Sequence, residues 1–208
     1  MNTSKVVLVH GIWVRGYIMM RLAEALRAAG FQTYIYSYPS TRYPLRQQAQ
    51  HLLEFLDREG ITAANFVTHS MGGLVLRHLA HLAPERIQTA VTMASPHQGS
   101  LAARSIRTKH LGWLLGKSYA QGLDGQLPAW PEAIPLGSLA GDRSVGLGKI
   151  FTRFNAPNDG TVQVDETRLP GMREHRILAH SHTGILYAAD TAREIAFFLQ
   201  QHCFSPQS

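Results

Sequence analysis

The sequence predicts an α/β protein in which helices sandwich a mostly parallel β-sheet. Short apolar segments alternate with longer segments whose apolar residues recur every three or four positions, the spacings of buried strands and of amphipathic helices. Successive strands that are separated by a helix pair in parallel through right-handed crossovers, so helices are expected on both faces of the sheet. The 208 residues suffice for one domain with a substantial core.

The first elements have the clearest patterns. Residues 6–9 form a continuous apolar run, which is typical of a strand buried on both faces. Residues 18–29 carry apolar side chains on one helical face, and Gly30 follows as a stop signal. Residues 33–38 are β-branched and aromatic, which favours a strand, and Pro39 ends it.

Four further segments continue the alternation. Residues 45–59 have leucine and alanine at helical spacing, and residues 65–69 form a short strand pattern. Residues 71–83 are again helical in pattern, until Pro84 stops the helix. Residues 87–94 are expected to form the next strand.

The alternation then breaks. Residues 95–135 contain apolar side chains without strand spacing, and the pattern resumes with a strand at 134–140. Residues 141–170 are expected to be mostly loop. A short last strand at 176–179 and a long closing helix at 183–201 complete the expected fold.

Composition excludes several classes of protein. Hydrophobic residues make up 45% and charged residues 16% of the chain, as in globular rather than disordered proteins. No apolar run approaches the roughly 20 residues of a membrane helix, and the run at 6–9 is shorter than the ~7–15 residues of a secretory signal core. The one cysteine, Cys203, cannot form an internal disulfide. We therefore expect a cytoplasmic protein without a stable membrane anchor.

Charge and motif spacing indicate neither nucleic acid nor a metal as a partner. The formal net charge is +6, but basic residues are scattered, except in 104–109, and no nucleic-acid module is recognisable. The histidines lack metal-binding H-E-x-x-H spacing, and no G-x-G-x-x-G follows the first strand. We expect no metal and no cofactor, and the sequence leaves the oligomeric state open.

The strongest functional signal is a serine between an expected strand and an expected helix. Residues 68–72 are T-H-S-M-G, which matches the pattern G-x-S-x-G with Thr68 in place of the first glycine. A serine hydroxyl is a poor nucleophile, and a sharp strand-to-helix turn presents it to a base in a fixed geometry. Ser70 could also serve only as a helix N-cap. That role does not explain two glycines in the first turn, which lower helix propensity.

Five short motifs are spread over nearly the whole chain. They are V-H-G at 9–11, T-H-S-M-G-G at 68–73, A-S-P-H-Q-G-S at 94–100, N-D-G-T-V at 158–162 and H-T-G at 182–184. Together they resemble the α/β-hydrolase superfamily, in particular small bacterial triacylglycerol lipases and hydrolases related to GPI-inositol deacylases. The resemblance implies the α/β-hydrolase fold and a serine esterase with a catalytic triad. The motifs are poorly specific for the substrate.

The expected catalytic partners of Ser70 follow late strands, because this fold has the chain order serine, acid, histidine. His182 follows the last expected strand and matches the family's His-Thr-Gly motif, and His180 is the alternative base. Asp159 matches the family's Asn-Asp-Gly motif, and Asp142 is the rival acid because it directly follows an expected strand. The acid would fix the imidazole tautomer and stabilise the imidazolium.

An oxyanion hole requires two backbone N–H groups that point toward the developing negative charge. The residue after the nucleophile, Met71, would supply one from a helix N-terminus. The turn after the first strand resembles the family's His-Gly turn, which assigns the other N–H to Ile12, with Trp13 as the second choice.

Residues 101–131 are predicted to form a small helical cap over the site. They follow the carboxyl end of a strand, where this fold places substrate-contacting loops, and they combine large apolar with basic side chains. Trp113 and Leu114, between two glycines, are expected to bind the substrate together with Trp13. Alternatively, the apolar side chains of this segment complete the hydrophobic core.

The expected reaction is hydrolysis of a carboxylic ester through an acyl-enzyme at Ser70, on a small-molecule or lipid-like substrate with an apolar acyl group. The same triad would serve a thioesterase, an amidase or an acyltransferase, and the sequence does not separate them. A non-catalytic binding protein of this fold is the remaining alternative. The complete set of Ser70, Asp159 and His182 argues against it.

Overall fold

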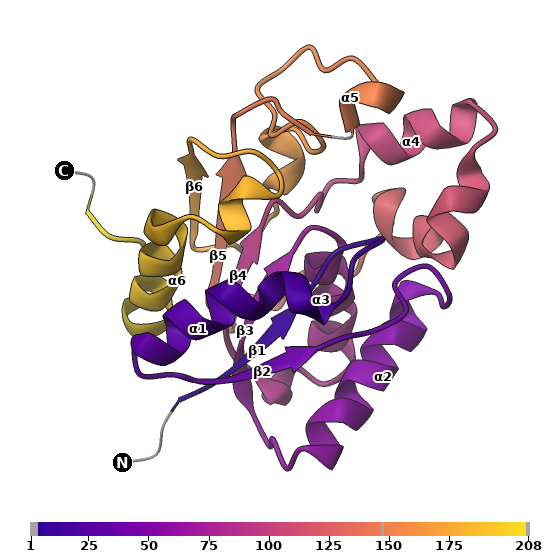
Figure 1. The fold of residues 1–208 in the computed structure, drawn as a ribbon. Coiled ribbons are helices and arrows are strands. Elements are labelled where there is room, and N and C mark those ends of the chain that lie inside the picture. Colours follow the sequence, from indigo (N-terminus) through magenta and orange to yellow (C-terminus); the bar gives the residue numbers. More distant parts are fainter. Residues whose placement is uncertain (1–3, 147, 207–208) are drawn as a thin grey trace.

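A parallel sheet forms the centre of the computed structural model, which describes residues 4–146 and 148–206 (Figure 1). Within these residues six strands lie in the order β2-β1-β3-β4-β5-β6, and every neighbouring pair is parallel. The predicted α/β class with a parallel sheet is therefore confirmed. The strands are β1 (Lys5–Val9), β2 (Gln32–Tyr36), β3 (Ala64–His69), β4 (Ile87–Met93), β5 (Leu136–Gly141) and β6 (Glu174–Leu178).

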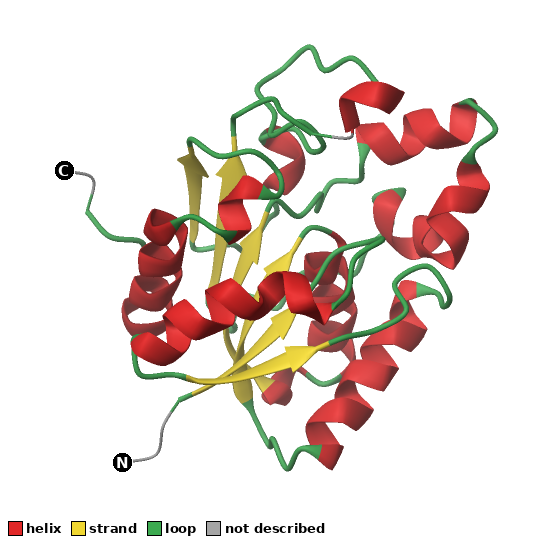
Figure 2. Ribbon diagram, viewed as in Figure 1, coloured by secondary structure: helices red, strands yellow, loops and turns green. Residues whose placement is uncertain are grey.

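Four long helices cover the two faces of the sheet, as Figure 2 shows. Helices α1 (Met20–Ala28) and α6 (Ala189–Gln201) pack on one face, and α2 (Leu45–Arg58) and α3 (Met71–Leu82) pack on the other. Helices α1, α2 and α6 carry an apolar stripe toward the strands and a polar face toward water, as expected of amphipathic helices, whereas α3 is buried along most of its length. The sheet is thus buried on both sides and its carboxyl edge is left for loops.

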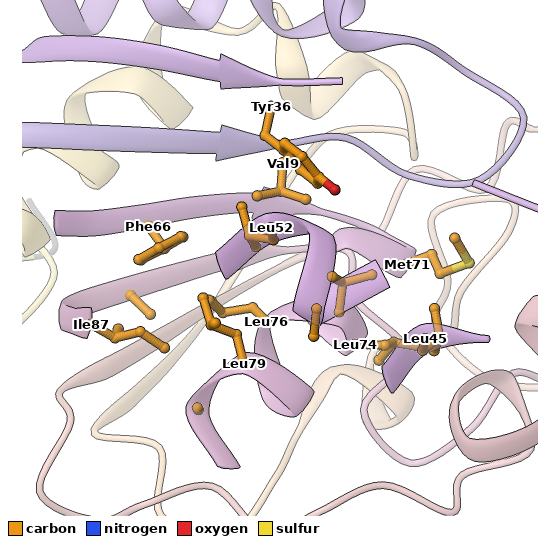
Figure 3. Close-up of a cluster of buried hydrophobic side chains, with 14 of the residues drawn as sticks. Val9, Tyr36, Leu45, Leu52, Phe66, Met71, Leu74, Leu76, Leu79 and Ile87 are labelled. Carbon is orange, nitrogen blue, oxygen red and sulfur yellow. The ribbon is translucent and has the colours of Figure 1, made fainter. Parts of the chain in front are cut away.

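The hydrophobic core consists of two clusters that are separated by the sheet. Along β1 the fully buried side chains alternate: Val7 and Val9 belong to the cluster beneath α2 and α3, and Val6 and Leu8 belong to the cluster beneath α1 and α6. Figure 3 shows the first cluster, in which leucines of α2 and α3 gather around Val9 and Phe66 of the sheet. Burying each such side chain contributes about 1.5–3 kcal/mol, so the strands that position the site are firmly anchored.

Several predicted element boundaries differ from the observed ones by a few residues, and two of these differences lie at the carboxyl edge of the sheet. The expected helix at 183–201 is a short turn, η6 (Gly184–Leu186), followed by α6, because Ala188 adopts an extended conformation (φ −81°, ψ 133°). The strand expected at 33–38 ends at Tyr36, because the N–H of Tyr38 donates to the ring of His10. Both corrections leave more loop at the carboxyl edge of the sheet.

The two connections around β5 lie over this edge (Figure 1). Between β4 and β5 the chain forms α4 (Leu101–Thr108), η3 (Gly112–Ser118) and η4 (Tyr119–Leu123). Between β5 and β6 it is mostly loop, as predicted, with two short turns, α5 (Gly148–Phe151) and η5 (Asp165–Thr167). The remaining turns are η1 (Gly16–Met19) and η2 (Pro84–Arg86). None of the helices in the described residues is both long and apolar enough to cross a membrane.

Candidate active site

Ser70 lies at the sharp turn between β3 and α3. Its backbone has φ 53° and ψ −125°, a conformation that side chains of L-residues rarely adopt and that is typical of strained functional positions. The helix can start here because Gly72 has no side chain: a Cβ at this position would lie 2.5 Å from the carbonyl oxygen of Val9. Gly73 likewise leaves room for Ser95, since a Cβ at position 73 would lie 2.8 Å from the Ser95 Cβ. The close crossing of helix and strand fixes the direction of the serine side chain.

Ser70, His182 and Asp159 form a chain of short polar contacts. The Nε2 of His182 lies 3.1 Å from the Oγ of Ser70, and its Nδ1 lies 2.7 Å from the Oδ2 of Asp159. The other oxygen of this buried carboxylate, Oδ1, accepts the backbone N–H groups of Thr161 (2.8 Å) and Val162 (2.7 Å). The carboxylate therefore accepts the Nδ1–H of His182, which leaves the Nε2 lone pair to accept the serine proton.

Three different strands deliver these side chains to one edge of the sheet. Ser70 directly follows β3, Asp159 lies in the loop after β5, and His182 lies in the loop after β6. The backbone N–H of His182 also donates to the carbonyl oxygen of Asp159 (2.9 Å). This hydrogen bond fixes the two loops relative to each other. The site thus lies outside the carboxyl ends of the strands, where ligands bind in open α/β sheets.

The structure does not bring the rival residues to Ser70. His180 interacts instead with Asp190, with its Nε2 at 2.8 and 2.9 Å from the two carboxylate oxygens. Asp142 is exposed at the end of β5. Asp159 and His182 therefore remain the proposed acid and base.

The turn after β1 runs beside the serine. A Cβ on Gly11 would lie 2.9 Å from the Cβ of Ser70, so only glycine allows this approach. The N–H of Trp13 is already used, because it donates to the Oγ of Ser40 (3.0 Å). The N–H groups of Ile12 and Met71 have no acceptor among the described residues. This arrangement favours Ile12 over Trp13 as the partner of Met71 in the proposed oxyanion hole.

Two pockets meet at Ser70. One has about 470 Å³ of empty volume, partly open to solvent, and is lined almost entirely by apolar groups. The other has about 830 Å³ and lies beside His182. Ile12, Trp13, Ser70 and Thr161 line both pockets. The first pocket, called the apolar pocket below, is further lined by Pro96, Ser100, Ala102, Ala103, Ile106, Leu115, Leu123, Gly148, Phe151 and Val162.

Comparison with known proteins identifies the family. Residues 5–130 match the family described as alpha/beta hydrolase fold, which is more than half of the chain. The chain belongs to the α/β-hydrolases. Its resemblance to lipases and esterases, expected from the sequence, is confirmed by the relatives described next.

Two curated relatives and one solved structure illustrate the likeness of this α/β-hydrolase. The triacylglycerol lipase of Pseudomonas fragi is 31% identical over 36% of this chain and 26% of its own length. The triacylglycerol lipase of Vibrio cholerae serotype O1 is 24% identical over 78% of this chain and 60% of its own length. The chain therefore spans less than two thirds of these relatives. The mature lipase BlEst2 of Bacillus licheniformis has the same fold, with a TM-score of 0.72, 20% identity, and coverage of 97% of this chain and 93% of that one.

His10 holds the turn beside the serine of this α/β-hydrolase. Its Nδ1–H donates to the Gly11 carbonyl oxygen (2.8 Å), and its Nε2 accepts the N–H of Tyr38 (3.1 Å). The His10 and Tyr38 rings stack with centroids 4.4 Å apart. Burial lowers the pKa of His10, so the ring stays neutral and keeps both contacts. The Gly11 carbonyl and the Ile12 N–H belong to the same peptide group. His10 therefore helps to position the Ile12 N–H that is the proposed donor.

His69 supports the proposed base more directly than the sequence indicated. Its Nε2–H donates to the carbonyl oxygen of His182 (2.8 Å), and the two rings lie 4.8 Å apart. Burial, together with the nearby His182, lowers the pKa of His69 to about 3. His69 therefore stays neutral when His182 takes a proton. The only sequence signal for this role was its place directly before Ser70.

Glu166 connects the loop of Asp159 to the wall of the apolar pocket, a role that no pattern in the sequence indicated. Its Oε2 accepts the N–H of Gln163 (2.9 Å), and its Oε1 accepts the N–H of Leu101 (2.6 Å) at the start of α4. The side chain is buried, and burial raises the pKa of this carboxyl group. Glu166 therefore fixes α4 relative to the loop that carries Asp159.

The lining of the apolar pocket corrects the expectation for the cap. Neither Trp113 nor Leu114 is among the described residues that line the two pockets, and Trp113 is 74% exposed. The turn η3 directs Leu115 inward, where it is buried and lines the apolar pocket, so Trp113 two residues earlier points away. Ile106, Leu115 and Leu123 take the place expected for the two predicted residues, and they also belong to the main core cluster. Trp13 does line both pockets.

Acid is expected to destabilise this α/β-hydrolase through histidines that are buried in the neutral form. Burial lowers the pKa of His69 and of His97 from 6.5 to about 3. Since the unfolded chain binds these protons more readily, their contribution is fully present above pH 6.5 and is lost as the pH falls toward 3. Each histidine would reduce the free energy of unfolding by about 1.4 kcal/mol per pH unit in that range.

Urea denaturation between pH 7 and pH 5 measures this loss. The His97→Gln variant should show a shallower pH dependence than the wild type, because it lacks one of the buried histidines that titrate. Replacement of the exposed His81 by glutamine is the matched control. Identical slopes for His97→Gln and the wild type would contradict the assignment.

Proposed function

We propose that this α/β-hydrolase cleaves carboxylic esters through an acyl-enzyme at Ser70. The observation that carries the proposal is the arrangement of Ser70 Oγ, His182 and Asp159 in consecutive contacts of 3.1 and 2.7 Å. This arrangement meets the geometric requirement for a nucleophile, a base and an orienting acid. The names of the curated relatives, triacylglycerol lipases, agree with ester chemistry.

Acylation begins when the Ser70 Oγ attacks the carbonyl carbon of the ester. His182 Nε2 takes the serine proton, and the carboxylate of Asp159 stabilises the resulting imidazolium. The carbonyl oxygen becomes negatively charged and accepts the N–H groups of Ile12 and Met71. The bond to the alcohol oxygen then breaks, and the alcohol leaves with the proton from His182.

Deacylation repeats these steps with water. A water molecule in the pocket beside His182 gives its proton to Nε2 and attacks the acyl carbon. The second tetrahedral intermediate releases Ser70, which recovers its proton from His182. The carboxylic acid is the second product, and no cofactor takes part.

The two pockets suggest how the substrate lies. The apolar pocket fits an acyl group, because its lining offers few hydrogen bonds to a polar one. The other pocket is adjacent to the His182 side chain, which must protonate the departing alcohol. The proposed substrate is therefore an ester whose acyl part is apolar.

Labelling of Ser70 with a fluorophosphonate probe, located by peptide mass spectrometry, tests this function. We expect the His182→Ala variant to lose labelling, because an unassisted serine is unreactive. The His180→Ala variant is the matched control and should label normally, since His180 interacts with Asp190 instead. Loss of labelling in the His180 variant alone would reverse the assignment of the base.

Matched substrates separate esters from the other chemistries of the same triad. A p-nitrophenyl ester, a p-nitroanilide and a thioester with the same acyl group should be hydrolysed at different rates, with the ester fastest. If the thioester or the anilide were hydrolysed faster than the ester, that substrate class would replace esters in the proposed function. The proposed catalytic residues would stay the same.

A further inference from the structure

We propose that Trp13 is a specificity-determining residue that fastens η3 over the apolar pocket. The pocket is then preformed, and the enzyme acts on single dissolved esters with compact acyl groups rather than on aggregated ones. This inference rests on the proposed function, because it names the substrate class of that same site. It is carried by the contacts of Trp13 and by two further attachments of η3.

Trp13 lies in the turn beside Ser70 and contacts both the loop after β2 and the cap. Its backbone has φ 62°, an unfavourable conformation for a bulky residue, and its N–H donates to the Ser40 Oγ (3.0 Å). Its indole Nε1–H donates to the carbonyl oxygen of Leu114 (2.7 Å), 101 residues further along the chain. The side chain lines both pockets and forms part of the boundary between them.

Two more attachments follow within four residues of Leu114. The N–H of Lys117 donates to the Thr41 carbonyl oxygen (3.0 Å), and the Ser118 hydroxyl donates to the Ser40 carbonyl oxygen. Gly116 directly precedes Lys117 and has φ 56°, and a Cβ on it would collide with the backbone of Thr41. The loop after β2 and the turn after β1 thus hold η3 at three points.

Leu115 lies between these attachments and closes the apolar pocket. Its side chain is 2% exposed and belongs to the core cluster beneath α2 and α3. Opening the cap would break the three hydrogen bonds and expose Leu115 to water. The arrangement is that of a fixed pocket wall, which limits the size of the acyl group at all times.

The chain-length profile of the enzyme tests the role of Trp13. For wild-type protein we expect saturation by dissolved p-nitrophenyl esters and no further rise in rate when the longer esters aggregate. In Trp13→Phe, which lacks the Nε1–H, the KM for hexanoate and octanoate should rise roughly fivefold or more, with kcat changed less than about twofold. The KM for the acetate should rise less than the KM for octanoate, because the short acyl group does not reach η3.

Two further variants control this experiment. Trp130→Phe removes an equivalent indole hydrogen bond, from Nε1 to the Ile134 carbonyl oxygen (2.9 Å), in a residue that lines neither pocket, and should keep the wild-type profile. Ser118→Ala removes a different attachment of η3 and should raise the KM for octanoate as Trp13→Phe does. If Trp13→Phe does not fold, the Ser118→Ala variant provides the same test.

Hydrogen exchange of the amides in residues 111–118 provides a readout independent of catalysis. These amides should exchange slowly in the wild type and roughly tenfold faster in Trp13→Phe or Ser118→Ala. Fast exchange in the wild type, an increase in rate on substrate aggregation, or an unchanged octanoate KM in both variants would overturn the proposal. Absence of Ser70 labelling and of ester cleavage would refute the proposed function, and the exchange measurement would then decide by itself whether η3 is fastened.

Discussion

Replacing Ser70 with alanine is expected to lower kcat by roughly 10⁴- to 10⁶-fold without unfolding the protein. The variant lacks the Oγ that attacks the ester carbonyl in the proposed mechanism, and no other hydroxyl lies within hydrogen-bonding distance of the His182 Nε2 among the described residues. Initial rates with a p-nitrophenyl ester at saturating concentration measure the loss.

The fold should tolerate this change. Alanine keeps the Cβ of residue 70, so the strain of its positive φ is similar in both proteins, and within the described residues the Oγ loses a hydrogen bond to the His182 ring alone. A melting temperature close to that of the wild type is therefore the control. A folded variant that kept more than a few per cent of the wild-type kcat would exclude Ser70 as the nucleophile.

Asp159→Asn should lower kcat by roughly 10⁴-fold. The carboxylate accepts hydrogen bonds on both oxygens, from backbone N–H groups and from the His182 ring, whereas an amide has one oxygen only. Oδ1 must accept the N–H groups of Thr161 and Val162, so the amide oxygen of asparagine would take this place. Its NH₂ group would then face the Nδ1 of His182 and donate to it. The ring would carry its proton on Nε2, next to Ser70, and could no longer accept the serine proton.

Asp142→Asn is the matched control for this prediction. Asp142 also follows β5 but is exposed, so its replacement should change kcat less than about twofold. Nitrogen chemical shifts of the His182 ring would report the tautomer in each variant. A large loss in Asp142→Asn together with a small one in Asp159→Asn would place the acid at the strand end instead.

The parallel sheet could be predicted from the sequence because central strands such as β1 are apolar on both faces. Val6 to Val9 and Phe66 to Val67 alternate between the two core clusters, so their sequence is a continuous apolar run. The serine turn was predictable for a related reason, since glycines next to a helix start cost stability and imply a close crossing.

The functional residues that could not be predicted from the sequence form hydrogen bonds to backbone groups of distant segments. Such bonds leave no recognisable pattern in the sequence. Glu166 is an ordinary charged loop residue in the sequence, and only the fold brings the N–H of Leu101 to its carboxylate. Trp113 was expected in the pocket because it is large and apolar. The direction of η3, which the attachments of Lys117 and Ser118 determine, instead turns the smaller Leu115 inward.

The position of His182 after the edge strand has a consequence for the order of folding. Ser70 and His182 are 112 residues apart, and β6 pairs with β5 alone among the described strands. Parallel pairings between distant segments form slowly, and during synthesis the N-terminal part of the chain emerges first. A partly folded chain that lacks β6 would therefore hold a nucleophile but no base. Such a chain would be inert toward esters, so esterase activity would arise only with the docking of the last strand.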